Sequence, residues 1–575
     1  QQGQALDREE PPFLIVLGRA VEHAQDARRQ ADDLVGGPPQ PRVARHPGPG
    51  IGAAALEGDN QLRDRHLFPP RLVGGHWHVH RWRAPVMLGP AHFRFLNNER
   101  ELAFPDAWNA PDLDKLWLYN LHYFDDLNAI DAGDRRVWHE ALIQRWIVDN
   151  PPPGGNGWEP YPLSLRIVNW IKWALAGNSL NAEAVHSLAV QIRQLRRRLE
   201  FHLLGNHLFE NAKALVFAGF FFTGEESQEW LKTGRRLLDE QIREQVLADG
   251  GHFELSPMYH GLILEGLLDL TNVYHTFQLD PPDAWSDAIE RMLDWLRVMC
   301  HPDGGIAFFN DTALDVAPGL VELERYAASL GVANELHGAG SRLLEASGYA
   351  RLERGDAVVL ADVAAIGPDY LPGHAHADSL SFELSLHGQR VLVNSGTSVY
   401  GVGPERLRQR GTAAHNTVRL DGVDSSEVWS GFRVARRARV RVERFDEQSG
   451  PVLQAVHDGY RRLDGRPVHR RLWTMGAHAL ELRDAVDGDG NHLVEIYFHF
   501  HPGMRLELVG PTAFSIRRND GSLMLDLSAD NKMLWQVEPG FWHPGFGVSV
   551  ANVCLRGTYQ GPLPVYLLTR LVWRV

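Results

Sequence analysis

Residues 374–393 read HAHADSLSFELSLHGQRVLV, and this stretch decides the fold of the second half of the chain. From residue 380 onward the large apolar side chains occupy every second position: Leu380, Phe382, Leu384 and Leu386. His387-Gly388 then marks a turn, and Val391 and Val393 resume the alternation. Because successive side chains of a β-strand point to opposite faces, the pattern predicts a hairpin with one apolar face and one polar face.

The same period of two returns further along the chain, at Val494, Ile496, Phe498 and Phe500. Alternating strands in series are typical of antiparallel sheets that stack on one another. We therefore predict an antiparallel β-sandwich over residues 346–575.

The first half of the chain has a helical period instead. Between about residues 110 and 300 the apolar residues recur every three or four positions, as in Leu188, Ile192, Leu195 and Leu199. This predicts helical hairpins packed side by side over residues 76–345. Residues 1–75 are rich in Pro, Gly, Arg and Asp, so we expect a poorly defined N-terminal extension there. A chain of 575 residues also favours two large domains over one.

Composition and charge exclude several functions. A net charge of -14 disfavours binding to nucleic acid, and an anionic substrate would need a local basic cleft. Apolar runs stay short of the roughly 20 residues of a membrane helix, so we expect no membrane insertion. Cys300 and Cys554 lack metal-ligand spacing. The chain opens without a basic start and apolar stretch, which predicts a periplasmic or secreted protein if a signal peptide was removed and a cytoplasmic one otherwise.

Residues 205–211, GNHLFEN, gather polar groups at a predicted helix start. Gly205 can end one helix and Asn206 can cap the next, and capping alone would explain Asn206. His207, Glu210 and Asn211 add three more polar groups within two turns, which favours a functional site.

Residues 249–260, DGGHFELSPMYH, form a second polar cluster ahead of a helix. Ser256 is a candidate N-cap, and Pro257 suits the first helical position. Tyr259 and His260 would then lie in the first turn, where the helix dipole favours an ionised phenol. Tyr259 is therefore a candidate proton carrier.

Two further segments are candidates for substrate contact. Residues 158–166, WEPYPLSLR, combine aromatic rings that pack on sugars with an Arg that binds carboxylates or sulfates. Core aromatics beside a surface Arg are the alternative. The segment from Tyr400 to Arg410 could supply local positive charge, or it could be a solvated charged loop.

His374 and His376 are one residue apart, so on a strand their side chains would share a face. With His415 they could supply two metal ligands and a catalytic imidazole, and zinc would favour a third, anionic ligand. A polar strand end is the alternative.

At these motifs the sequence resembles the heparinase II/III-like polysaccharide lyases. The resemblance rests on residues 205–211, 251–260, 374–382 and 413–417. It implies a multidomain α+β protein, with an incomplete (α/α) toroid over residues 76–345 and an antiparallel β-sandwich over residues 346–575. It also implies an enzyme that cleaves a uronic-acid-containing anionic polysaccharide by β-elimination and leaves 4,5-unsaturated uronate ends.

The resemblance implies a role for each motif. Asn206 would bind the uronate carboxylate, with His207 beside it. Tyr259 would act as the base or as the acid toward the leaving oxygen, and His374 would polarise the carboxylate or serve as the alternative base. Such charge neutralisation and proton transfer are needed because the C5 proton is only weakly acidic. The residues expected to line the substrate site are Trp158, Glu159, Tyr161, Arg166, Glu210, Glu254, His260, Tyr400, Arg406 and Arg410.

The resemblance also implies one structural divalent metal, zinc or similar, at His376, Asn394 and His415. Asn394 stands where related chains carry Asp, and a neutral amide oxygen is a weaker ligand for zinc. The three residues could instead form a hydrogen-bonded scaffold that orients His374.

Two other functions stay open from the sequence. A glycoside hydrolase on an (α/α) barrel could use paired carboxylates such as Glu210 and Glu254. A non-catalytic polysaccharide-binding protein of exopolysaccharide assembly could retain the fold. The polymer is open among glycosaminoglycans, alginate-like uronates and bacterial exopolysaccharides, and so is the oligomeric state.

Overall fold

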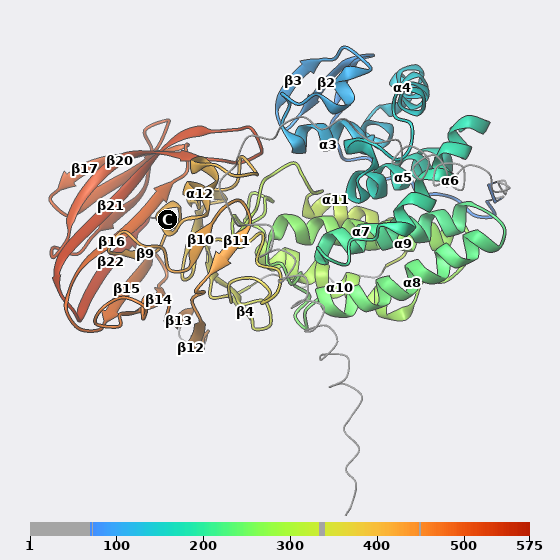
Figure 1. Ribbon diagram of the computed structural model, residues 1–575. Coiled ribbons are helices and arrows are strands. Elements are labelled where there is room, and N and C mark those ends of the chain that lie inside the picture. Colours follow the sequence, from blue (N-terminus) through green and yellow to red (C-terminus); the bar gives the residue numbers. More distant parts are fainter. Residues whose placement is uncertain (1–69, 72, 333–339, 448–449, 575) are drawn as a thin grey trace, which may run out of the picture.

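The computed structural model describes residues 70–71, 73–332, 340–447 and 450–574. Helices fill the first half of this range and strands fill the second, as Figure 1 shows from blue-green to red. The predicted order of a helical part followed by antiparallel sheets is therefore confirmed. The expectation of an irregular extension over residues 1–75 lies almost entirely outside the described residues.

The helical part is built from helices that pack on the next or the next-but-one helix of the chain. In order they are α3 (Lys115–Tyr123), α4 (Arg136–Asp149), α5 (Pro160–Leu175), α6 (Ala182–Arg197), α7 (Gly205–Phe221), α8 (Glu225–Gln245), α9 (Pro257–Thr276), α10 (Asp283–Met299) and α11 (Leu320–Ser329). Helices α7 and α9 are buried along nearly their whole length, whereas α8 and α10 expose one polar face to water. Helices α7 and α9 therefore form the inner layer of the toroid, and the site residues at their N-termini are held by a rigid core.

A small sheet precedes these helices and departs from the all-helical expectation for residues 76–345. It consists of β1 (Met87–Gly89), β2 (His92–Phe95) and β3 (Asn98–Glu101). Phe93 and Phe95 alternate with exposed polar residues, so the strand buries one face against the helices.

The second half contains two large antiparallel sheets, coloured yellow to red in Figure 1, beside a small two-stranded one. The first has the order β20 (Leu534–Trp542), β21 (Val550–Pro562), β16 (Asn491–Phe500), β8 (Gln389–Leu392), β7 (Phe382–Leu386), β6 (Ala357–Asp362), β5 (Tyr349–Arg354) and β4 (Arg342–Leu344), with β9 (Val418–Leu420) paired to β16. The second has the order β12 (Val440–Asp446), β13 (Val452–His457), β14 (Val468–Met475), β15 (Ala479–Asp487), β22 (Val565–Val572), β19 (Leu523–Ser528), β18 (Ala513–Arg518) and β17 (Met504–Gly510). Their apolar faces meet in one core, which makes the predicted sandwich.

Strands β7 and β8 are the hairpin predicted from residues 380–393. The polar face of β7, however, is not in water, because Glu383 and Ser385 are fully buried. His301, just after α10, contacts both: its Nε2 lies 2.8 Å from Glu383 Oε2 and its Nδ1 lies 2.8 Å from Ser385 Oγ. The apolar side chains of β7 thus face the core of the sandwich, and its polar side chains face the junction with the helical part.

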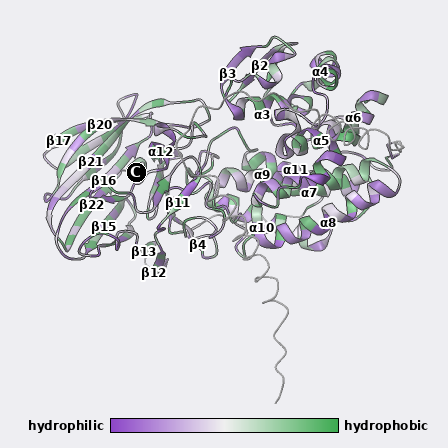
Figure 2. Cartoon of the chain, viewed as in Figure 1, coloured by the Kyte–Doolittle hydropathy of each residue, from purple (hydrophilic) through white to green (hydrophobic). Residues whose placement is uncertain are grey.

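Each half has its own hydrophobic core, and in Figure 2 green segments, which mark hydrophobic residues, recur along the helices and strands. Within the described residues, the helices are all too short or too polar to span a membrane. The site described next lies between the two cores.

Candidate active site

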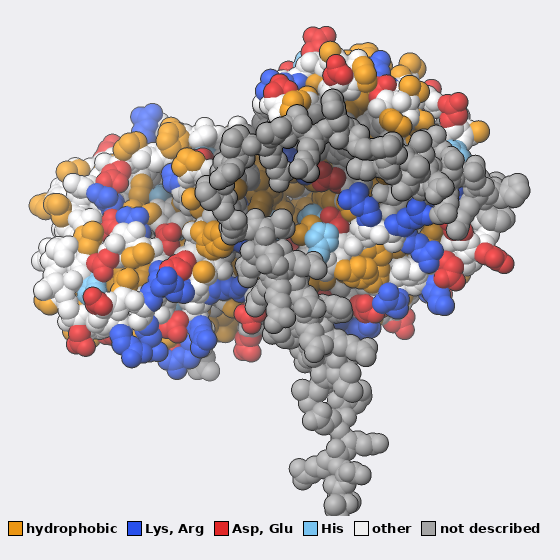
Figure 3. All heavy atoms as spheres, viewed as in Figure 1, with side chains coloured by type: hydrophobic (Ala, Val, Ile, Leu, Met, Phe, Trp, Pro, Cys, Tyr) orange, Lys and Arg blue, Asp and Glu red, His pale blue; other side chains and the backbone are white. Residues whose placement is uncertain are grey.

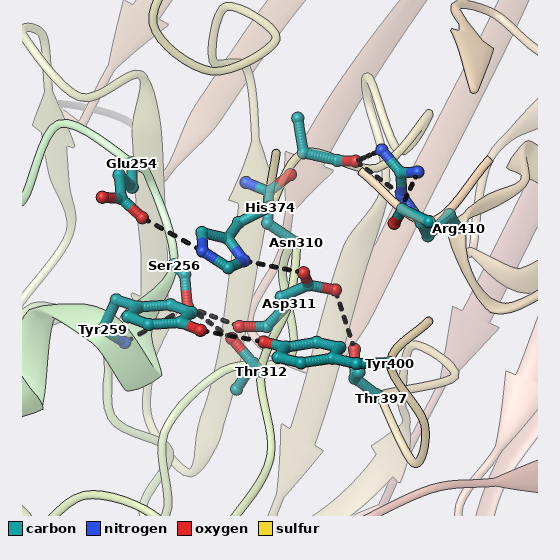
Figure 4. Close-up of polar contacts among 12 residues, drawn as sticks. Glu254, Ser256, Tyr259, Asn310, Asp311, Thr312, His374, Thr397, Tyr400 and Arg410 are labelled. Atoms are coloured by element: carbon teal, nitrogen blue, oxygen red, sulfur yellow. Dashed lines mark hydrogen bonds and ion pairs between the residues drawn. The ribbon is translucent and has the colours of Figure 1, made fainter. Parts of the chain in front are cut away.

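The candidate site forms where the N-terminus of α9 meets loops of the sandwich, and in Figure 3 hydrophobic, acidic and histidine side chains gather at this junction. Ser256 caps α9, since its Oγ accepts a hydrogen bond from Tyr259 N at 3.3 Å, and Pro257 begins the helix as predicted. The ring centroid of Tyr259 lies 4.1 Å from that of His374, and the Tyr259 and Tyr400 hydroxyls are 3.1 Å apart (Figure 4). Residues from both halves of the chain therefore share one site.

His374 lies between two carboxylates. Its Nδ1 is 2.9 Å from Asp311 Oδ2, and its Nε2 is 3.4 Å from Glu254 Oε2 (Figure 4). The Asp311 carboxylate also binds both terminal nitrogens of Arg406, with Nη2 at 2.7 Å. Burial would raise the pKa of Asp311, but Arg406 and the neighbouring histidines hold it well below its usual range. Asp311 is therefore an ionised acceptor that fixes the Nδ1–H tautomer of His374.

Glu254 connects His374 to Asn206. The Asn206 backbone N–H donates to Glu254 Oε1 at 3.0 Å, and its amide Nδ2 lies 3.3 and 3.4 Å from the two carboxylate oxygens. Glu254 itself is only 1% exposed. The expectation that Glu254 contacts the polymer is corrected: it is a buried link that orients the groups on either side.

His207 lies at the more open end of the site, with about a third of its side chain exposed. Its Nδ1 is 3.2 Å from Glu200 Oε1, and its ring centroid is 4.4 Å from that of Tyr161. Glu159, two residues before Tyr161, is partly exposed and binds the Tyr119 hydroxyl and Lys115. Tyr161, His207 and Glu159 thus remain accessible to a ligand.

The protonation expected for Tyr259 is corrected by its surroundings. Burial raises the pKa of Tyr259 well above its usual range, and the neighbouring Tyr400 and carboxylates add to the effect. This outweighs the helix dipole, which was expected to favour ionisation, because only a small part of the phenol reaches water. The Tyr259 phenol is therefore neutral and keeps its proton.

Two residues expected to bind sugar lie in the helical core instead. Trp158 is 2% exposed, and its Nε1 donates to Asn150 O at 3.1 Å. Arg166 is fully buried, donates to Gly157 O and His122 O, and lies 3.8 Å over the Trp146 ring. Their role is to hold the segment before α5 in place.

Three further expected contacts are also internal. His260 is fully buried, with its Nε2 2.9 Å from Met292 O. Glu210 is paired with Lys213 Nζ at 2.8 Å inside the toroid, so the Glu210 and Glu254 pair considered for hydrolysis is buried on both sides. Arg410 is buried too, and among the described residues its hydrogen bonds go to backbone carbonyls such as Ala375 O at 2.9 Å. Arg406 and Arg410 were expected to offer positive charge to the substrate. Both guanidinium groups instead bind acceptors of the protein itself.

A buried group suited to a metal lies behind His374. His376, Asp378 and His415 place one ligand atom each within 4.8 Å of one another. Within the described residues, His376 Nδ1, Asp378 Oδ1 and both ring nitrogens of His415 have no hydrogen-bond partner. Burial lowers the pKa of His415 well below its usual range, so its imidazole is neutral, the form that binds metals.

Asn394, the third expected ligand, is already engaged. Its Nδ2 donates to Phe308 O at 3.0 Å, and its Oδ1 accepts from Asn416 N at 3.1 Å. These bonds hold Asn394 in a hydrogen-bonded network, and the carboxylate that lies beside His376 and His415 is Asp378, two residues after His376.

The sequence motifs missed Asp311. It follows Asn310 in a loop without helical or strand periodicity, and only its tertiary contacts mark it as part of the site.

Two family models together match most of the chain. The heparinase II/III N-terminus matches residues 130–327, and the heparinase II/III-like C-terminal model matches residues 337–562. The chain belongs to the heparinase II/III-like polysaccharide lyase family. It is accordingly an enzyme of the polysaccharide lyase class.

Individual relatives of this lyase agree with the fold. A heparin-sulfate lyase of Bacteroides stercoris is 29% identical over 497 residues, covering 81% of this chain and 69% of the relative. The FtsZ-localized protein C of Caulobacter vibrioides is 29% identical over 435 residues, covering 70% of this chain and 72% of the relative. The crystal structure of a heparinase III superposes with a TM-score of 0.67 at 17% identity, over 81% of this chain and 79% of that one, which supports the architecture of a toroid followed by a sandwich.

Proposed function

We propose that this lyase cleaves a uronic-acid-containing anionic polysaccharide by β-elimination and leaves a 4,5-unsaturated uronate end. One observation carries the proposal: the ring centroid of Tyr259, from the helical part, lies 4.1 Å from that of His374, from the sandwich. Asn206 joins them through Glu254. The set offers an amide, an imidazole and a neutral phenol, the three kinds of group that this elimination needs.

The first task is to neutralise the uronate carboxylate, because its charge opposes removal of the C5 proton. The amide Nδ2 of Asn206 makes only long contacts of 3.3 and 3.4 Å with Glu254, so it can turn toward an incoming carboxylate at little cost. A hydrogen bond that strengthens as the enolate-like charge develops would lower the barrier.

The second task is proton transfer. The Nδ1–H of His374 is committed to Asp311, which leaves Nε2 to take the C5 proton. The neutral hydroxyl of Tyr259 then donates its proton to the departing O4, and Tyr400 beside it can share the resulting charge through their 3.1 Å contact. His374 takes one proton and Tyr259 gives one, so the proton balance requires no group besides these two.

The relatives and the charge support a proposal for the substrate class. Relatives of this chain include heparin-sulfate lyases, so we propose a glycosaminoglycan-like polymer as the first candidate. The net charge of -14 gives no general attraction for such a polymer, so recognition has to come from groups in the cleft.

We further propose that His376, Asp378 and His415 hold one structural divalent metal, zinc or similar. The free ring nitrogens and carboxylate oxygen fit such an ion, which would link the segment of His374, His376 and Asp378 to the segment that carries His415. Elemental analysis of the purified protein, beside a His415→Ala variant, tests the site. Metal in the parent and not in the variant supports it, and metal-free parent protein contradicts it.

The experiment for the main proposal is a panel of uronate polymers followed by near-ultraviolet absorbance. Elimination creates a conjugated C4=C5 double bond that absorbs there, whereas hydrolysis produces chain ends without this signal. New reducing ends without absorbance would favour the hydrolase alternative. Binding without either product would favour a non-catalytic role.

A further inference from the structure

Phe432 lies in the turn between β10 (Glu427–Trp429) and β11 (Arg433–Ala435). Its ring centroid is 6.2 Å from that of His374 and 5.3 Å from that of Tyr400, in both cases edge to face. The residue is nevertheless 41% exposed. A large apolar ring thus remains in water beside the proton-transfer pair.

Buried arginines hold this turn from below. The Gly431 carbonyl accepts from Arg406 Nε at 3.0 Å and from Arg410 Nη1 at 3.1 Å. Arg410 also donates to Ser430 O and Arg433 O, each at 3.3 Å. Since burying a guanidinium is unfavourable without such hydrogen bonds, both arginines are coupled to the position of the turn.

The turn also packs closely on the segment that carries Tyr400. A Cβ atom at Gly431 would lie 2.5 Å from Gly401 O, so only glycine allows this approach. Phe432 is therefore fixed relative to Tyr400 and His374 before any ligand arrives, and a preorganised contact of this kind favours binding.

From these observations we infer that Phe432 forms a sugar-binding subsite, in which its ring packs against the apolar C–H face of a pyranose adjoining the uronate that is cleaved. The inference rests on the proposed function, because the sugar belongs to the polymer bound for elimination. An aromatic ring offers a flat apolar surface that matches the C–H face of a pyranose.

A purely structural role for Phe432 would be to cover the buried Arg406, whose guanidinium lies 5.3 Å from the ring. Leucine would still supply apolar cover but not a flat ring, and tyrosine would supply both. The variants Phe432→Leu and Phe432→Tyr therefore separate the two roles.

The test measures steady-state kinetics of unsaturated product and, separately, equilibrium binding of a defined oligosaccharide to the inactive Tyr259→Phe background. Phe432→Ala and Phe432→Leu are expected to raise KM and weaken binding by about five- to tenfold, with kcat changed by less than about threefold. Phe432→Tyr should restore both values. The control is Phe541→Ala, which removes a similarly exposed ring, 49% accessible, from β20.

The outcomes separate the two proposals. Unchanged KM and binding in Phe432→Leu would overturn the subsite even if product forms normally. Weaker binding in the alanine and leucine variants, together with an absence of unsaturated product from the parent, would keep the subsite and overturn the elimination. A parent that neither binds nor cleaves any polymer of the panel would overturn both.

Discussion

At the scale of single residues, Asp311 shows what a sequence motif cannot reveal. Asn206, Tyr259 and His374 stood out because each lies in a polar motif, and all three reach the same site. Asp311 has no motif of its own, yet it binds His374, His376 and Arg406. Trp158 is the opposite case. It lies in a motif that predicted sugar contact, but helices from elsewhere in the chain bury it.

Removing the charge of Asp311 should affect both stability and activity. Asp311→Asn leaves the buried Arg406 without its ionised partner, which should cost about 3–5 kcal/mol of unfolding free energy. It should also lower kcat, because an amide no longer fixes the tautomer of His374. Denaturant unfolding and product formation would measure the two effects.

Asp487→Asn is the matched control for this change. Asp487 also pairs with an arginine, Arg470, at 2.7 Å, but both side chains are about a third exposed. The control should change the unfolding free energy by about 1 kcal/mol or less and leave kcat unaltered. Equal losses in the two variants would contradict the special role of Asp311.

The role of Tyr259 as the proton donor can be tested by removing one oxygen atom. Tyr259→Phe removes only the hydroxyl, so kcat should fall by about 10²–10⁴-fold while substrate still binds. Tyr566→Phe removes the hydroxyl of an exposed tyrosine on β22 and should have no effect. Near-normal turnover of Tyr259→Phe would move the donor role to another group, Tyr400 first.

At the scale of elements, the start of α9 and the strand period could be predicted, but the start of α7 and the environment of each face could not. Helix α7 begins at Gly205, so Asn206, which was expected to cap it, lies inside its first turn. Ser256 and Pro257 begin α9 as their residue types indicate. The period of two correctly located β7 and β8. It could not show that Glu383 and Ser385 face another domain, because a polar side chain looks the same in water and in a buried hydrogen-bonded junction.

The cap of α9 should link helix stability to activity. Ser256→Ala removes the acceptor for Tyr259 N and a donor to Asp311 O, which should cost about 0.5–2 kcal/mol of unfolding free energy. It should also lower kcat, since the same residue positions Tyr259 and the Asp311 loop. Thermal unfolding and the product assay would report both losses.

A second cap provides the comparison. Asn181 caps α6 by accepting from Ala184 N at 2.9 Å, away from the site. Asn181→Ala should destabilise the protein by a similar amount with kcat unchanged. If Ser256→Ala lost no more activity than this variant, the cap would have only a structural role.

At the scale of the whole molecule, buried neutral histidines set the response to acid. Burial lowers the pKa of His122 and His260 to about 3 and that of His252 and His499 to about 4. The unfolded chain titrates these groups near 6.5, so it binds more protons than the folded protein between these values. Stability should therefore fall as the pH drops from about 6.5 toward 4, by about 1.4 kcal/mol per pH unit for each histidine.

Urea unfolding at a series of pH values checks this expectation. The slope should decrease by about one proton in His499→Gln, which removes one of the four groups. A stability that is constant between pH 6.5 and 5, or an unaltered slope in the variant, would contradict the assignment.

The buried polar face of β7 limits how the two halves of such proteins can be exchanged by recombination. Its Glu383 and Ser385 are satisfied by His301, and Glu383 also accepts from Phe308 N at 2.9 Å. A gene fragment that encoded the sandwich alone would expose this face and remove His301 and Phe308, so that Glu383 would keep only partners of the sandwich such as Asn394 N at 2.8 Å. Recombination that joined the sandwich to a foreign helical domain would be disfavoured for the same reason, so the two halves should travel between genomes as one cassette.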